Sequence, residues 1–147
     1  MKVFFILCIM LFGHLIEMPA QYKVTVINST NESLTLRAVG YGQKAALAVE
    51  NAEISALNAV LFVGHAGTAF PQPLINEDRN SIESKHKSVF DDFYGGQYRD
   101  YIGTSVIVTP FGKNELKQKC ITIDVSVRVK ALRTYLENKG IIRKFGF

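Results

Sequence analysis

One stretch near the end of the chain limits the fold more than any other, because apolar and polar residues alternate there without a break. The apolar positions are all β-branched, and polar residues fill the places between them: Ile121, Ile123, Val125, Val127 and Val129, with Thr122, Asp124, Ser126 and Arg128. Side chains of a strand point alternately to the two faces of a sheet, and β-branched residues favour strands. The pattern predicts an antiparallel strand with one buried and one solvated face.

Three further runs predict strands. Residues 22–26 alternate in the same way, and after a polar turn the alternation resumes at Leu34, Leu36 and Ala38, which indicates a hairpin. A third, β-branched run from Thr104 to Thr109 predicts a strand that stops at Pro110, because proline cannot donate to a strand ladder.

Between these strands the apolar period changes to that of a helix. From Gln43 to about Phe62, apolar residues recur every three or four positions and polar residues take the opposite side: Ala45, Val49, Ala52, Ala56 and Val60, against Lys44, Asn51, Ser55 and Asn58. Small residues let a helix lie close to a sheet. Gly40 and Gly42, just before it, permit close backbone approach or a positive φ.

Two more helices and one long loop complete the expected elements. Asn80 with Glu83 resembles a capping box and predicts a helix that ends at the glycine pair 95–96, with one face formed by Ile82, His86, Val89, Phe90 and Phe93. Residues 130–139 predict a short helix closed by Gly140. Residues 63–79 predict a loop.

The order of elements, β-β-α-α-β-β-α, predicts an α+β fold. We expect an antiparallel sheet of four to five strands with helices packed on one face. The chain has 147 residues, is 48% hydrophobic and shows no internal repeat. Residues 21–147 are therefore expected to form a single domain.

Residues 1–20 have the features of a secretory signal peptide. Lys2 is followed by an apolar run to Phe12, and Ala20 offers a small residue for cleavage before Gln21. We expect a periplasmic or secreted protein. Of the two cysteines, Cys8 lies in this segment, so Cys120 has no partner within the mature chain.

The residue types that carry chemistry do not fall into a catalytic pattern. His65 and His86 lack a metal-ligand spacing, and no known signature surrounds Cys120. Glu50 and Glu53 share a helix face, which solvent exposure explains. We therefore expect no catalytic residue, no metal and no cofactor.

Charge placement points to a partner-binding segment at the end of the chain. Residues 128–147 carry six basic side chains against Glu137 alone. The candidate partner-binding residues are these cations and two terminal aromatics: Arg128, Lys130, Arg133, Lys139, Arg143, Lys144, Phe145 and Phe147. The expected partner is an envelope protein or an anionic surface group, with peripheral rather than integral membrane association. Nucleic acid is not expected, because the chain reads as exported.

Residues 34–42 and the alanine-rich run after them carry a family resemblance. A strand ends in Gly40 and Gly42 and leads into a helix with Ala45, Ala52, Ala56 and Ala59. This arrangement resembles the N-terminal domain of the flagellar assembly protein T and related bacterial envelope lipoproteins. The resemblance implies a small α+β domain used for assembly or binding, with no active site to carry over. The chain departs from the pattern in having no lipobox before Cys8 and a long excursion between its second and third predicted strands.

The expected function is that of an exported bacterial envelope protein that acts as a binding or assembly module without catalysis. The alternative is a small cone-shaped ligand carrier or hydrolase. That reading would place a cleft between the sheet and the Val63–Tyr101 segment, with Tyr94, Tyr98 and Tyr101 at its mouth.

Overall fold

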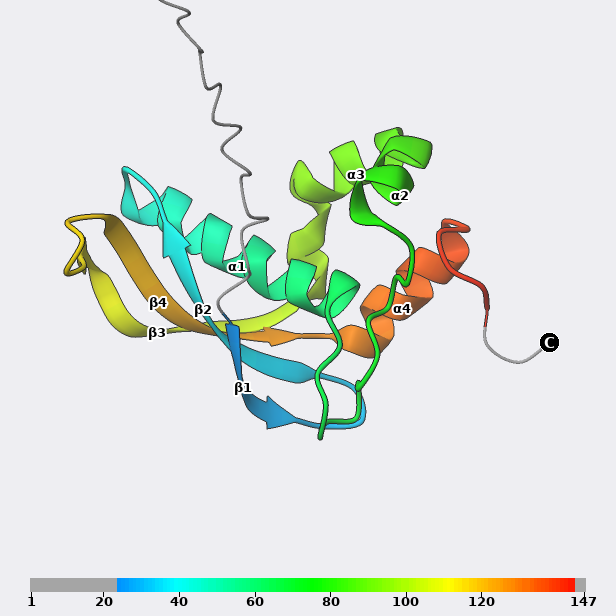
Figure 1. Cartoon of the computed structure of the whole chain (residues 1–147), viewed down its shortest axis with the longest axis horizontal. Helices are drawn as coiled ribbons and strands as arrows, with labels where there is room; N and C mark the ends of the chain where they lie inside the picture. Colours follow the sequence, from blue (N-terminus) through cyan, green and yellow to red (C-terminus); the bar gives the residue numbers. More distant parts are fainter. Residues whose placement is uncertain (1–23, 145–147) are drawn as a thin grey trace, which may run out of the picture.

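The computed structural model describes residues 24–144 and folds them around one antiparallel sheet (Figure 1). The predicted signal peptide, Phe145 and Phe147 lie outside the described residues. The sheet has four strands in the order β1-β2-β4-β3: β1 (Val24–Ser29), β2 (Leu34–Tyr41), β3 (Ile102–Lys113) and β4 (Lys119–Val127). The predicted α+β class, with its antiparallel sheet, is confirmed.

Four helices and one 3-10 turn lie beside this sheet: α1 (Ala45–Phe62), α2 (Arg79–Lys85), α3 (Lys87–Tyr94), η1 (Gln97–Tyr101) and α4 (Val129–Asn138). In Figure 1, α1 crosses one face of the sheet and α4 follows directly from β4. The helices α2 and α3 lie above the C-terminal part of α1. By length and composition α1 could cross a membrane, but nearly half of the helix is buried inside this fold.

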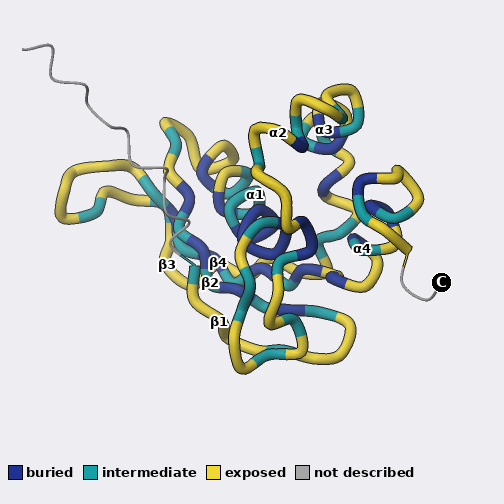
Figure 2. The backbone as a smooth tube through the Cα atoms, turned by 45° about the vertical axis from the view of Figure 1, so that its right-hand side comes forward, coloured by how far each residue is buried: buried dark blue, intermediate teal, exposed yellow. Residues whose placement is uncertain are grey.

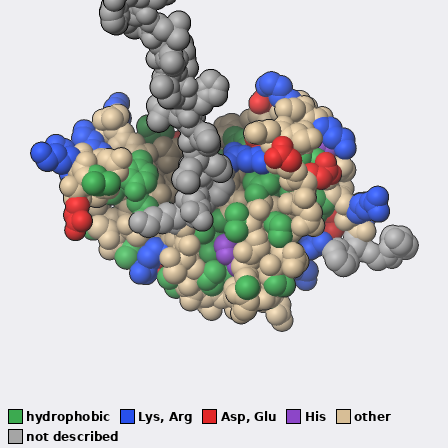
Figure 3. All heavy atoms as spheres, in the orientation of Figure 1, with side chains coloured by type: hydrophobic (Ala, Val, Ile, Leu, Met, Phe, Trp, Pro, Cys, Tyr) green, Lys and Arg blue, Asp and Glu red, His purple; other side chains and the backbone are tan. Residues whose placement is uncertain are grey.

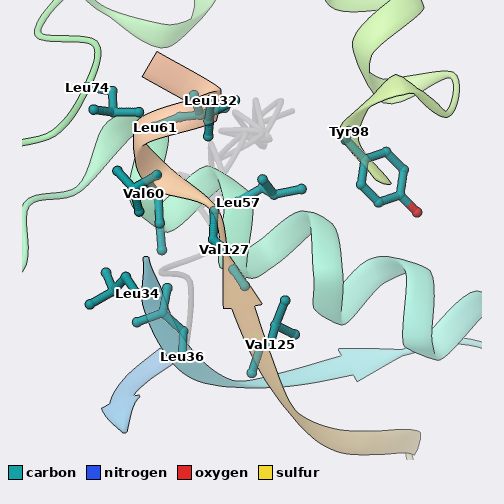
Figure 4. Packing of buried hydrophobic residues seen from close by; sticks show 14 of the residues in the cluster. Leu34, Leu36, Leu57, Val60, Leu61, Leu74, Tyr98, Val125, Val127 and Leu132 are labelled. Atoms are coloured by element: carbon teal, nitrogen blue, oxygen red, sulfur yellow. The ribbon is translucent and has the colours of Figure 1, made fainter. Parts of the chain in front are cut away.

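The core lies between α1 and the two central strands. The inward residues of β2 and β4 are buried as their alternation predicts: Leu34, Leu36, Ala38, Ile121, Ile123, Val125 and Val127. Figure 4 shows the side chains of Leu57, Val60 and Leu61 directed toward this group. On α1 the predicted positions Ala52, Ala56 and Val60 are buried, but Ala48 takes the place expected for Ala45, which is exposed.

Gly40 is the residue that lets α1 lie so close to β2. A Cβ atom at this position would stand 1.8 Å from the carbonyl oxygen of Ala48 and 2.8 Å from the Cβ of Ala52. Only a residue without a side chain fits there. The close backbone approach expected at Gly40 is therefore confirmed.

The single helix predicted after residue 80 is wrong in two respects. The chain breaks at His86 (φ −118°, ψ 39°), which separates α2 from α3. The first helix is capped by Asp78 rather than Asn80, because the Asp78 carboxylate accepts a hydrogen bond from the Ser81 amide at 3.0 Å. Ile82, Phe90 and Phe93 are nevertheless buried as expected.

Asn58 was expected on the solvated side of α1 and is instead only 3% exposed. The reason is that α2 and α3 pack over this side of the helix. The hydroxyl of Tyr94 on α3 lies 2.8 Å from Asn58 Oδ1 and 2.9 Å from Glu83 Oε1. Burial together with the charge of Glu83 raises the pKa of Tyr94, so the phenol stays neutral and can donate.

The loop that follows α1 is tied to the end of the helix. The amides of Leu74 and Ile75 donate to the carbonyls of Val60 and Leu61 at 3.3 and 2.8 Å, and both loop side chains are buried. These bonds satisfy carbonyl groups that the end of a helix leaves free. The second half of this loop therefore packs into the core.

Candidate functional site

Strand β3 is exposed along almost its whole length. It is an edge strand of the sheet, and every residue from Gly103 to Pro110 is exposed, on both faces. Val106, Ile107 and Val108 are 58%, 60% and 40% exposed. Figure 2 shows β3 and the turn that joins it to β4 mostly as exposed, while buried and half-buried stretches lie along the centre of the sheet.

The exposure follows from where α1 lies. In the ladder, Ile107 of β3 stands opposite Ile123 of β4, so the two side chains share the inner face. Ile123 is 1% exposed and Ile107 is 60% exposed, because α1 covers the central strands and leaves the inner face of β3 largely uncovered. Two strands of similar composition in one hairpin therefore differ in how far they are buried.

The prediction that this strand ends at Pro110 is wrong, since β3 continues to Lys113. An edge strand accepts proline because its missing N–H can face solvent instead of a neighbouring strand. The register with β4 shifts on both sides of Thr109. Such irregularities bend a strand, and the hairpin curves upward at its free end in Figure 1.

The distribution of charge over the strands is unusual for a protein that works alone. The central strands carry charged residues, with Arg37 on β2 bound to Asp124 on β4 at 2.8 and 3.0 Å. The edge strand β3 carries none before its last residue, Lys113, and β1 carries none at all. Natural proteins commonly place charges, especially lysine, on edge strands to prevent pairing with other chains. Residues 103–108 of β3 lack such a charge, and the features that limit pairing on this strand, Pro110 and the register shifts around Thr109, lie beyond them.

The predicted partner-binding residues are only partly brought together. Arg128 and Lys130 lie at the start of α4 and border an open depression of about 920 Å³ that the β1–β2 turn and Ser126 also line. Lys130 lies 3.6 Å from Glu32 of that turn. Arg143 and Lys144 are exposed beyond the helix.

Two of the predicted cations are engaged within α4 itself. Arg133 donates to Glu137 at 3.2 Å, and the ammonium of Lys139 lies 5.7 Å from the centre of the Tyr135 ring. Ile141, in the segment expected to dock to a partner, is buried at 6% exposure. Its amide donates to Leu136, so this part of the tail closes the core.

A second basic surface is one that the sequence pattern did not predict. Lys113, Lys117 and Lys119 of the β3–β4 hairpin border one depression of about 480 Å³, together with Tyr41 and Leu47. The basic and acidic side chains of residues 21–127 nearly balance. For this reason the net charge of that range gave no sign of the three lysines. Three closely spaced lysines around a predicted turn were the available signal.

The tyrosines expected at the mouth of a cleft serve mainly as packing groups. Tyr98 is fully buried, and Tyr101 stacks at 6.1 Å on Phe93. Tyr94 borders an open depression of about 610 Å³ between α2 and α3. This depression is open, whereas a carrier would need an enclosed cavity between the sheet and the Val63–Tyr101 segment.

The remaining titratable groups lie apart from one another. Cys120 is half-buried on the face of the sheet opposite α1, as its phase predicts. Burial lowers the pKa of His65, whose ring lies 3.3 Å from the Ala59 carbonyl. Within the described residues, no three histidine, cysteine or acidic side chains are grouped so that they could hold a metal ion.

Comparison of the chain with models of known protein families, with curated proteins and with solved structures finds no match. A functional assignment therefore has to rest on the geometry and chemistry of the chain's own surfaces.

Proposed function

We propose that this chain is an exported bacterial envelope protein that acts as an assembly module without catalysis, and that its docking element is the edge of β3. The observation that carries the proposal is the uncharged edge on which Val106, Ile107 and Val108 are exposed together. An extended segment can add to such an edge through main-chain hydrogen bonds.

The occupant we propose is β3 of a second copy. An edge without charge favours a partner strand that is also uncharged and β-branched, and β3 itself has that chemistry. Two antiparallel β3 strands related by a two-fold axis near Ile107 would form a self-complementary interface. No like charges would meet along the strands, because Lys113 of each copy would lie opposite residue 101 of the other, at the far end from the second Lys113.

Burial of these side chains and a shared strand ladder would supply the favourable energy that such a contact needs against the cost of association. Full burial of a valine or isoleucine side chain contributes about 1.5–3 kcal/mol. Covering three roughly half-exposed side chains on each of two copies contributes on the order of 5 kcal/mol. The strand ladder adds hydrogen bonds, each with a net contribution of about 1 kcal/mol.

Sedimentation velocity over a concentration series tests this assignment. The purified protein is expected to form a dimer, and Ile107→Lys is expected to keep it monomeric, because two buried ammonium groups would face each other. Ile27→Lys is the matched control, since Ile27 is 45% exposed on the other edge strand and its variant should still dimerise. A monomeric wild type, or equal behaviour of the two variants, would contradict the proposal.

Export is a separate part of the proposal and has its own test. If residues 1–20 are a cleaved signal, the mass of the protein recovered from the periplasm or medium corresponds to a chain that begins at Gln21. Recovery of the full-length chain from the cytoplasm would contradict export without affecting the assignment of β3.

The resemblance to the flagellar assembly protein T domain stays a prediction and supports only the general role in assembly. The carrier or hydrolase alternative also stays open as a prediction, but no feature of the depression beside Tyr94 favours it over the strand edge.

A further inference from the structure

The free end of the β3–β4 hairpin combines positive charge with exposed apolar side chains. We call this surface the hairpin tip, and it comprises four lysines and three apolar residues from the hairpin, the end of β2 and the start of α1: Lys44, Lys113, Lys117, Lys119, Tyr41, Leu47 and Leu116. Glu115 is its only acidic neighbour within the hairpin turn. In Figure 3 this end, on the left, shows blue side chains around a green surface.

Leu116 stands at the outermost turn of the hairpin tip and is the most exposed large apolar side chain among the described residues. It is 77% exposed, against 45% for both Tyr41 and Leu47. Water does not favour this arrangement, because apolar surface is stabilised by burial. Single exposed apolar side chains are common on proteins, so Leu116 is informative here because it stands among the lysines of the hairpin tip.

The turn that presents Leu116 is held by a dense set of hydrogen bonds. The Asn114 side-chain oxygen accepts from the amides of Leu116 and Gln118 at 3.0 and 2.9 Å. The main chain of Asn114 also pairs with Gln118 and Lys117, and Lys117 takes a positive φ of 60°. These hydrogen bonds fix the backbone that carries Leu116.

None of the four lysines forms an ion pair with another residue in the described part of the chain. Their charges are therefore available to an external group. Against Glu115 alone, they leave the hairpin tip with a clear excess of positive charge.

We propose that the hairpin tip is a docking surface for a bilayer that contains anionic phospholipid. A bilayer offers both chemistries that the hairpin tip needs: phosphate groups for the ammonium groups, and acyl chains below them for Leu116. Lysine stems can lie along the apolar boundary while their ends stay among the headgroups. A free phosphate or polysaccharide would satisfy the lysines and leave the leucine in water.

This contact is independent of the strand edge proposed above. The hairpin tip lies at the end of β3, beyond the exposed residues 106–108, so both surfaces can be occupied in one molecule. A dimer would present two tips, and the failure of either proposal would leave the other to be judged by its own test.

A single-tryptophan reporter tests the bilayer contact, because the chain contains no tryptophan. Leu116→Trp is mixed with vesicles of one part phosphatidylglycerol to two parts phosphatidylcholine, and with phosphatidylcholine alone. We expect the emission to move to shorter wavelength, and brominated lipid to quench it, with the anionic vesicles only. Val63→Trp, at the other end of α1 where Val63 is 44% exposed, is the control and should not respond.

Charge variants in the Leu116→Trp background test the role of the lysines. Replacing Lys113, Lys117 and Lys119 with glutamine should weaken vesicle binding about a hundredfold, since each basic side chain near such a surface contributes about 1 kcal/mol. Glu115→Gln should strengthen it about fivefold by the same argument. The matched control replaces Lys139, Arg143 and Lys144 with glutamine and should leave binding within about twofold.

Three results would overturn the proposal: no spectral change of Trp at position 116 with anionic vesicles, an equal change at position 63, or an equal loss of binding in the control triple variant. The last result would assign the attraction to the overall charge of the protein.

Discussion

The two halves of the sheet have the same strand chemistry and opposite surroundings. In the central half, β2 and β4 alternate between buried and half-buried residues beneath α1. In the outer half, β3 is about as rich in β-branched residues as β4 and is exposed on both faces from Gly103 to Pro110. The local sequence therefore determines which segments form strands. Whether a strand lies in the core or at the surface depends on which strands α1 covers.

The strongest test of the covered half places a charge beneath α1. Ala56 is fully buried between the helix and the sheet, and Ala56→Glu is expected to lower the free energy of unfolding by on the order of 5 kcal/mol, because the carboxylate would have no partner. Ala46→Glu is the control on the same helix, at an exposed position of the first turn. It should be neutral or slightly stabilising. Similar melting of the two variants by circular dichroism would show that the buried face of α1 is misplaced.

Two glycines sharpen the comparison at the level of the backbone. Gly40→Ala is expected to cost about 3 kcal/mol, because the new Cβ would overlap the Ala48 carbonyl and force α1 away from β2. At Gly112 on β3 the nearest atom to an added Cβ is 3.9 Å away, so Gly112→Ala should change stability by less than about 1 kcal/mol. Urea denaturation of both variants measures the difference. An equal cost at the two sites would contradict the close approach at Gly40.

The facing pair Ile107 and Ile123 isolates the effect of burial from that of strand propensity. Ile123→Thr should lower the free energy of unfolding by about 2–3 kcal/mol, since it removes buried carbon and introduces a hydroxyl without a ready partner. Ile107→Thr, directly across the ladder, should change it by less than about 0.5 kcal/mol. Both are measured in dilute solution, where a dimer would dissociate. A large loss at Ile107 under those conditions would mean that the monomer already covers β3.

The smallest effects are expected at two tyrosines that join the helices to the core. The Tyr94 hydroxyl bonds to Asn58 and Glu83, so Tyr94→Phe should cost about 1–2 kcal/mol by leaving a buried acceptor unpaired. The buried Tyr98 hydroxyl has no hydrogen-bond partner in the described chain, so Tyr98→Phe should be neutral or slightly stabilising. Thermal melting compares the two, and a larger loss at Tyr98 would reveal a partner for its hydroxyl.

The covered half could be predicted from the sequence because periodicity records burial directly. The alternation through Ile121–Val127, the helical spacing of Ala52, Ala56 and Val60, and the glycine at position 40 each reflect one contact surface. The pattern does not show where further helices pack over α1. Asn58 looks solvated on a helical wheel and is buried because α3 returns over it.

The outer half was harder to predict because its properties arise in space rather than along the chain. A β-branched run such as residues 104–109 predicts a strand but not that the strand forms an edge, and the edge is what lets β3 pass through Pro110. Summing charge along the chain directed attention to residues 128–147. Three lysines of the hairpin tip are close together in the sequence, but they come to lie beside Tyr41 and Leu47 only when the hairpin folds next to the start of α1.

Whether the exposed edge of β3 is the docking element is tested most directly by backbone amide hydrogen exchange at low and high protein concentration. If β3 pairs with a second copy, the amides of residues 103–109 that point away from β4 become protected as the concentration rises, while those of β1 do not change. Exchange of β3 that stays equally fast at every concentration, or protection that grows on β1 instead, would contradict the assignment of this edge as the docking element.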